Sequence, residues 1–161
     1  MWKIIQQLCE DIRGNLTVYE AVVLMMTALG SWRCHGKNRV IPVGYSIFLI
    51  LYITLLRRAP EYNEAIRYHI SFLPDVKVWT GNLLNVILYV PLGGTIYNMV
   101  ASIKGTAFAA LLSSVLCEII QYFTHRGVAD INDVLFNLIG ACAGALLFRA
   151  YRAFKKKKDL Q

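Results

Sequence analysis

The stretch DINDVLFNLIGACAG, from Asp130 to Gly144, decides the fold. Its polar and small residues step along the chain by three, four, three and four positions, which places them on one face of a single α-helix. These residues are Asp130, Asp133, Asn137, Gly140 and Gly144. The two glycines form a small-xxx-small pair, which lets another helix approach closely. The segment therefore predicts an apolar helix with carboxylates at its entry and a helix-packing face deeper in.

The whole chain has the composition of a membrane protein. Its 161 residues are 57% hydrophobic and 17% charged, whereas a soluble domain is usually about 45–50% apolar and about 25% charged. This composition excludes a disordered chain, and the length fits a single domain. The net charge of +7 is explained by membrane topology, so we expect membrane lipids and no nucleic acid as partners.

Five apolar segments follow Asn15, and most approach the ~17–25 residues that cross a bilayer as a helix. They are Leu16–Trp32, Val40–Leu56, Leu83–Val100, Thr106–Phe123 and Val134–Phe154. The first is the weakest, because Glu20 lies inside it. We therefore predict an all-α, polytopic membrane helix bundle with about five transmembrane helices, or four if the first segment lies at the interface. Strands are not expected, because open β-edges cannot be satisfied in lipid.

The distribution of Lys and Arg predicts the orientation. The loop Arg33–Arg39, Lys104 and the tail Arg149–Lys158 fall on one side of the membrane and carry more basic residues than the other side. Because short cytoplasmic loops are enriched in Lys and Arg, we expect a multi-pass protein of the cell membrane with a cytoplasmic C-terminus. We assign residues 1–39 to an interfacial helix and a first membrane helix, residues 40–154 to the bundle, and residues 155–161 to a basic tail that touches anionic lipid.

Polar side chains at membrane depth are the candidates for function, because each costs free energy unless it faces the protein interior or a wet cavity. The third segment carries Asn82, Asn85 and Tyr89 on one helical face, followed by Pro91. Proline removes a backbone hydrogen bond and favours a kink. We therefore expect a polar face and a break in this helix within a few turns of each other.

The fourth segment carries Glu118 and Gln121, one helical turn apart. A carboxyl group at that depth is either neutral or paired with a cation, and Arg126 and Arg57 are the candidate cations. In the fifth segment, Asp130 or Asp133 could simply cap the helix N-terminus. Helix capping does not as easily explain the combination of Asp133 with Asn137 and Glu118.

On the five-crossing topology these polar residues converge toward the outer face of the membrane. The converging set is Arg57, Arg58, Asn82, Asn85, Glu118, Gln121, Arg126, Asp130 and Asp133. The four cysteines form no CxxC pair and have no His at a ligand spacing, so we predict neither a metal site nor a cofactor.

Three strings then resemble the signature of the VanZ-like membrane proteins: NVILYVPLGG, CEIIQYF and HRGVADINDVLFNLIGACAG. The resemblance runs from about Val40 to Phe148, and the first forty or so residues have no clear counterpart. Its functional positions fall on Arg57, Asn85, Glu118, Gln121, Arg126, Asp130, Asp133 and Asn137. Its structural positions include Pro91, Gly93 and Gly140, beside which Gly144 completes the small-residue pair.

The resemblance implies an association with resistance to lipoglycopeptide antibiotics of the teicoplanin type in Gram-positive bacteria. A glycopeptide acts outside the membrane on lipid-linked cell-wall precursors, which is compatible with an outward-facing polar cluster. The first hypothesis is therefore an outer polar pocket that engages a lipid-linked cell-wall precursor or a lipoglycopeptide.

Three alternatives remain. An intramembrane hydrolase of a lipid-linked cell-envelope substrate would use Glu118 or Asp133 as general base and Arg57 or Arg126 to hold a phosphate, although no catalytic motif is recognised. A transporter would use the broken third helix and require an oligomer. Finally, the polar residues could only hold the bundle together by hydrogen bonds between helices.

Overall fold

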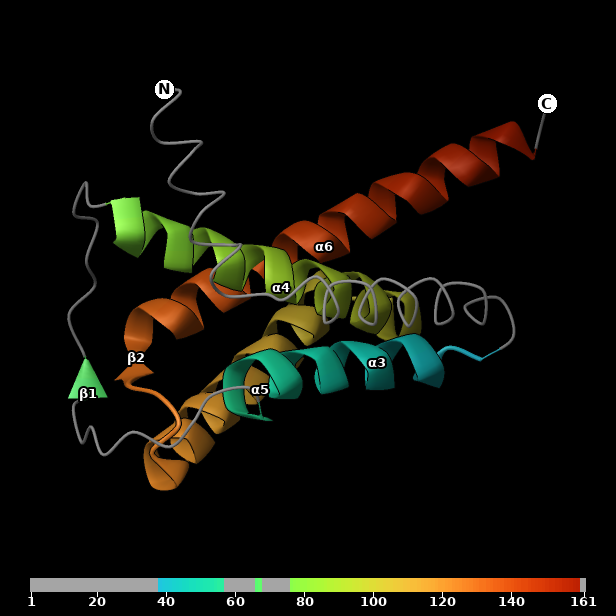
Figure 1. Ribbon diagram of the computed structural model, residues 1–161. Helices are drawn as coiled ribbons and strands as arrows, with labels where there is room; N and C mark the ends of the chain where they lie inside the picture. Colours follow the sequence, from blue (N-terminus) through green and yellow to red (C-terminus); the bar gives the residue numbers. More distant parts are fainter. Residues whose placement is uncertain (1–37, 57–65, 68–75, 160–161) are drawn as a thin grey trace, which may run out of the picture.

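The computed structural model describes residues 38–56, 66–67 and 76–159 (Figure 1). The described elements are α3 (Val40–Leu51), the π-helical turn η1 (Tyr52–Leu56), β1 (Ile66–Arg67), α4 (Val76–Val100), α5 (Ile103–Thr124), β2 (Ala129–Asp130) and α6 (Ile131–Lys158). The expected interfacial helix, the apolar segment Leu16–Trp32 and the candidate residues Arg57 and Arg58 lie outside the described residues.

The described part of the chain is a bundle of apolar helices, as predicted. Three helices are long and apolar enough to cross a membrane, namely Gly81–Val100, Ile103–Thr124 and Ile131–Lys158, and a shorter apolar helix covers Val40–Leu56. Four of the five expected segments are therefore helical at the expected places. Three of them extend beyond their apolar stretch, because backbone hydrogen bonding continues where polar residues begin; α6, for example, includes Lys155–Lys158.

Two of the sequence-based expectations are wrong. A short parallel strand pair joins β1 to β2, with Ile66 opposite Ala129 and Arg67 opposite Asp130. This pair forms in the connections between helices, where the argument against open strand edges in lipid does not apply. The second difference is at Pro91. This residue lies inside α4, and the helix continues on both sides of it, so the third segment does not have the expected break.

The turn between α4 and α5 is tight. Ala101 adopts the left-handed conformation with φ of 51°, and Ser102 caps α5 by accepting a hydrogen bond from the backbone nitrogen of Gly105 at 3.1 Å. Such short connections join antiparallel neighbours. The chain therefore reverses at this turn and again between α5 and α6, so that α4 and α6 run in the same direction.

The backbones of α4 and α6 touch each other, which is the closest packing in the fold. A Cβ atom added to Gly140 would overlap the carbonyl oxygen of Val86, and one added to Gly144 would overlap that of Val90. From the other side, a Cβ atom on Gly93 would overlap the carbonyl oxygen of Ala141. The prediction that Gly140 and Gly144 admit a neighbouring helix is confirmed.

The helix α5 has a polar buried face and an apolar exposed face, the reverse of a helix in a soluble protein. Its buried residues are Thr106, Ala110, Ser114, Cys117, Glu118 and Gln121. Its exposed side carries Phe108, Leu111, Leu112, Val115, Leu116, Ile119, Ile120 and Phe123. An apolar outer surface of this kind is stable only against lipid or another protein.

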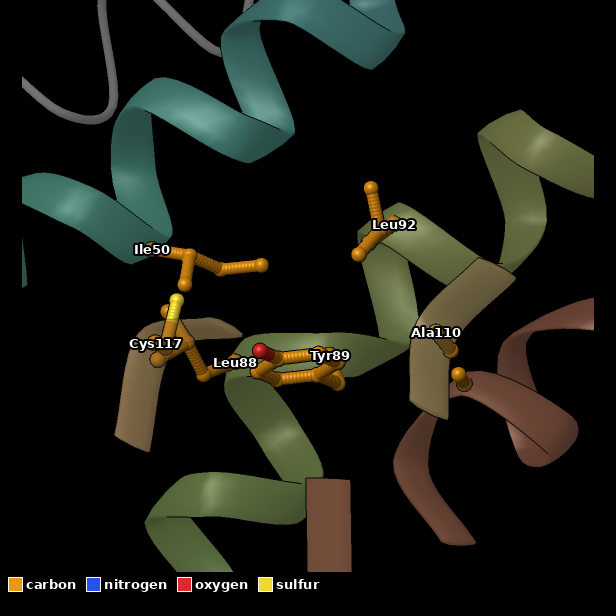
Figure 2. Close-up of a cluster of buried hydrophobic side chains, with 7 residues drawn as sticks. Ile50, Leu88, Tyr89, Leu92, Ala110 and Cys117 are labelled. Carbon is orange, nitrogen blue, oxygen red and sulfur yellow. The ribbon is translucent and has the colours of Figure 1, made fainter. Parts of the chain in front are cut away.

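The apolar core is correspondingly small. Figure 2 shows residues of α3, α4 and α5 meeting around the ring of Tyr89, whose side chain is fully buried. Ile50 and Cys117 lie on the side of the Tyr89 hydroxyl, whereas Ala110 lies beyond the other edge of the ring. With so little core, close contact between helix backbones carries much of the packing.

We expect Gly144→Ala to lower the free energy of unfolding by about 1–3 kcal/mol, because the added methyl group overpacks the contact with α4. Reversible unfolding of the full chain in mixed detergent micelles measures this change. The matched control is Gly81→Ala in α4, where a Cβ atom meets nothing within 4 Å. This control should be neutral or raise stability by up to about 1 kcal/mol through helix propensity. Equal stability of the two variants would contradict the packing.

Candidate functional site

The ends of α3, α4, α5 and α6 that carry the candidate polar residues meet at one end of the bundle (Figure 1). At this end α3 and η1 finish, α4 begins, α5 finishes and α6 begins, and the strands β1 and β2 lie beside them. We call this region the polar end. It comprises Asn85, Glu118, Gln121, Arg126, Asp130 and Asp133.

Glu118 holds the chain where it returns from α5 to α6. Its side chain is buried, and its Oε2 accepts a hydrogen bond from the backbone nitrogen of Asp130 at 2.9 Å. The sequence predicted that the Glu118 carboxyl group is either neutral or paired with a cation, and the structure adds a backbone amide as a partner. A buried carboxylate is stabilised by such a donor, so Glu118 fixes the position of β2.

Asp130 is the N-cap of α6. Its Oδ1 accepts a hydrogen bond from the backbone nitrogen of Asn132 at 2.9 Å, and its backbone is extended. This interaction satisfies one of the amides that the first helical turn leaves without an intrahelical partner. Of the two alternatives for Asp130, capping is therefore the one observed.

Asp133 has a different partner, on another helix. Its Oδ1 accepts a hydrogen bond from Nδ2 of Asn85 at 2.7 Å, which joins α6 to α4. Asp133 also lies in the first turn of α6, where a negative charge complements the helix dipole. Both side chains are half-buried, so the pair is placed where a ligand could reach it.

Gln121 and Arg126 bind the end of the second segment. Nε2 of Gln121 donates to the carbonyl oxygen of Thr54 at 3.2 Å, and Nη1 of Arg126 donates to that of Leu55 at 3.0 Å. The last carbonyl groups of a helix need partners from outside it, and a cation there also complements the dipole. These two residues therefore cap η1 from the neighbouring helix and turn.

Asn137 lies deeper in the bundle, away from the polar end. Its Nδ2 donates to Oγ of Ser114 at 2.9 Å, and both side chains are buried. Within the described residues, the buried polar atoms without a hydrogen-bond partner include Gln121 Oε1 and Asn137 Oδ1. The interior of the bundle is therefore polar along α5 from Ser114 to Gln121.

Two residues of this arrangement were missed by the sequence analysis. Ser114 could have been found, because Ser114, Glu118 and Gln121 follow one another at helical spacing on one face. Asn132 is buried at the start of α6 but lies off the polar face of that helix, so its position carries no such signal. Among the described residues, no group of three His, Cys, Asp or Glu side chains could hold a metal ion.

Comparison with known proteins gives one match. The model of a family described as VanZ/LLP1 matches residues 16–153, which is most of the chain. The match begins well before Val40, where the resemblance in the motifs began, so it includes the first apolar segment, Leu16–Trp32. No curated protein and no solved structure matches this chain.

We expect Glu118→Ala to lower the free energy of unfolding by about 1–3 kcal/mol, because the amide of Asp130 loses its acceptor. Glu118→Gln should keep most of the stability, because its side-chain carbonyl oxygen can still accept that hydrogen bond. Unfolding in mixed micelles measures both variants, with Ile119→Ala on the exposed face of the same helix as the control. A Gln variant as unstable as the Ala variant would show that the charge itself is needed.

A double-mutant cycle tests the bond between Asn85 and Asp133. We expect Asn85→Ala and Asp133→Ala to be non-additive in unfolding free energy by about 1.5–3 kcal/mol, the range for a hydrogen bond to a charged group. The double variant should be little less stable than Asp133→Ala alone. Additive losses would mean that the two side chains do not interact in the folded protein.

Proposed function

This chain belongs to the VanZ/LLP1 family, and we propose that it is a multi-pass protein of the cell membrane that lowers susceptibility to teicoplanin-type lipoglycopeptides through its polar end. The proposal takes its ligand class from the resemblance described above. One observation carries the proposal. The hydrogen-bonded pair of Asn85 and Asp133 lies at the same end of the bundle as the two side chains that cap η1, Gln121 and Arg126.

The charge distribution supports an outward-facing polar end. At the opposite end of the bundle Arg39 precedes α3, Lys104 lies in the first turn of α5, and α6 finishes with Lys155–Lys158. The polar end carries fewer described basic residues, namely Arg67 in β1, Lys77 in the first turn of α4, and Arg126. Under the positive-inside rule the opposite end is cytoplasmic. The polar end then meets the outer leaflet, which is where a glycopeptide and a lipid-linked cell-wall precursor are found.

Burial separates the residues that would contact a ligand from those that position them. Gln121 is 2% exposed and Glu118 is 8% exposed. Their side chains bind the backbone groups of Thr54 and Asp130, so we assign them positioning roles. Asn85 and Asp133 are half-buried and offer an amide and a carboxylate side by side. This pair is the proposed contact for the polar part of the ligand.

Apolar side chains surround the bundle at the level of this pair. Leu83 and Ile87 of α4 are exposed on the side of the helix away from Asn85, and Phe123 at the end of α5 is 74% exposed. In a bilayer these side chains face acyl chains. A lipoglycopeptide or a lipid-linked precursor would therefore place its polar group at Asn85 and Asp133 and its hydrocarbon chain in the surrounding lipid.

The hydrolase and transporter hypotheses receive less support. A general base needs an oxygen within reach of the substrate's proton. One oxygen of each candidate base already accepts a hydrogen bond, that of Glu118 from the backbone amide of Asp130 and that of Asp133 from Asn85. The transporter hypothesis used a broken third helix, but α4 is continuous through Pro91. Binding through Asn85 and Asp133 needs neither feature.

The test is expression of the full chain in a susceptible Gram-positive host, with growth inhibition measured for teicoplanin and vancomycin in parallel. We expect the inhibitory concentration of teicoplanin to rise by several twofold dilution steps and that of vancomycin to change less. The lipid chain of teicoplanin is the physical reason for the difference. An unchanged teicoplanin value at a normal membrane level of the protein would refute the proposal.

The matched variants are Asp133→Asn at the polar end and Asp159→Asn at the opposite end, which make the same chemical change. Asp133→Asn keeps an acceptor oxygen for Asn85, so the fold should be preserved while the charge is lost. We expect this variant to lose the teicoplanin effect and Asp159→Asn to retain it. If both retained the effect at equal protein levels, the polar end would not be the site.

A further inference from the structure

The C-terminal part of α6 is longer than a membrane crossing requires. The helix has 28 residues, which corresponds to about 42 Å at 1.5 Å per residue, against a hydrocarbon core of about 30 Å. Its last turns extend past the other helices in Figure 1. Every residue from Arg149 to Asp159 is exposed, so this extension is not buried against another described helix.

The extension is amphipathic, with two stripes at helical spacing. Arg149, Arg152 and Lys156 are spaced by three and four positions and form a basic stripe. Leu147, Tyr151 and Phe154 are spaced by four and three positions and form an apolar stripe, with exposed fractions of 63%, 60% and 75%. At about 100° of rotation per residue, the two stripes lie on opposite sides of the helix.

We propose that this extension binds the surface of a bilayer that contains anionic phospholipid, with the apolar stripe in the interface and the basic stripe at the phosphate groups. Aromatic side chains are favoured at the level of the headgroups. Lys and Arg next to a membrane helix are attracted to anionic lipid, and Arg binds phosphate by two parallel hydrogen bonds. The proposal does not rest on the function proposed for the polar end.

The apolar stripe favours a bilayer over another polyanion. A nucleic acid would account for the basic stripe, but it would leave the aromatic side chains of Tyr151 and Phe154 on the opposite side in water. A bilayer accounts for both stripes, because α6 passes from the hydrocarbon core into the headgroup layer, where aromatic side chains and basic side chains are both favoured. One acidic side chain, Asp159, lies among six basic ones in this extension, so the local charge is strongly positive.

The experiment titrates the full chain in uncharged detergent micelles with a fluorescent short-chain phosphatidylglycerol, and in parallel with the phosphatidylcholine analogue. We expect the anionic lipid to bind about tenfold or more tightly than the zwitterionic lipid, and the difference to shrink when salt is raised from about 0.05 M to about 0.5 M. Equal affinity for the two lipids would overturn the proposal.

Two triple variants remove the same number of charges from different places. The variant Arg149→Gln/Arg152→Gln/Lys156→Gln removes all three charges of the basic stripe. We expect this variant to bind phosphatidylglycerol no better than phosphatidylcholine. Lys155→Gln/Lys157→Gln/Lys158→Gln removes three charges elsewhere on the extension and should keep most of the preference. If both variants lost the preference for phosphatidylglycerol equally, the role of the basic stripe would be overturned, because the total charge alone would then explain the binding.

Two further measurements keep the result interpretable. The circular dichroism spectra of both variants should match that of the wild type, because all six side chains are exposed. If the first variant lost helix, the variant Arg149→Lys/Arg152→Lys, which keeps the charges, should have both the helix content and the lipid preference of the wild type. Single-stranded DNA added as a competitor should displace the lipid only weakly. Displacement at equal affinity would overturn the assignment to a membrane surface.

Discussion

The contact between the backbones of α4 and α6 is the constraint on which the rest of the structure depends. Gly140 and Gly144 present no side chain to the carbonyl oxygens of Val86 and Val90, so the two helices approach more closely than any helix with side chains at these positions could. That approach brings Asn85 within hydrogen-bond distance of Asp133. In lipid there is no hydrophobic drive between helices, so close van der Waals contact and interhelical hydrogen bonds have to hold the bundle. The polar end is therefore built on the glycine contact.

The polar residues of this bundle divide by what they bind. Glu118, Gln121 and Arg126 bind backbone groups of other elements, and Asp130 binds the first turn of its own helix. These interactions satisfy helix ends and connections that water would otherwise have to satisfy. The pair of Asn85 and Asp133 instead joins two side chains at a half-buried position. Most of this polar cluster is therefore structural, and Asn85 and Asp133 differ from the rest because their hydrogen bond joins two side chains.

The two ends of the bundle are chemically different, and the difference follows from the sequence of the helix ends. One end gathers carboxylates and amides around the starts of α4 and α6, whereas the other gathers basic residues, most of them on the extension of α6. Between the ends, the exposed surface of α5 is apolar and its buried face is polar. A chain built in this way matches a bilayer along its whole length, with acyl chains around the middle and different headgroup layers at each end.

The sequence alone determined the helical membrane fold, the helix-packing role of the glycines and the membership of Asn85, Glu118, Asp130 and Asp133 in one region. These follow from composition and from spacings of three and four residues, which are local properties of a helix. Only the tertiary structure decided which groups bind each other. Gln121 and Arg126 bond to carbonyl groups 67 and 71 positions away, and Ile66 of β1 pairs with Ala129 of β2, 63 positions further along the chain. Periodicity shows which face of a helix a residue occupies, but the partner on that face depends on how the helices are arranged, because backbone acceptors carry no signal in the sequence.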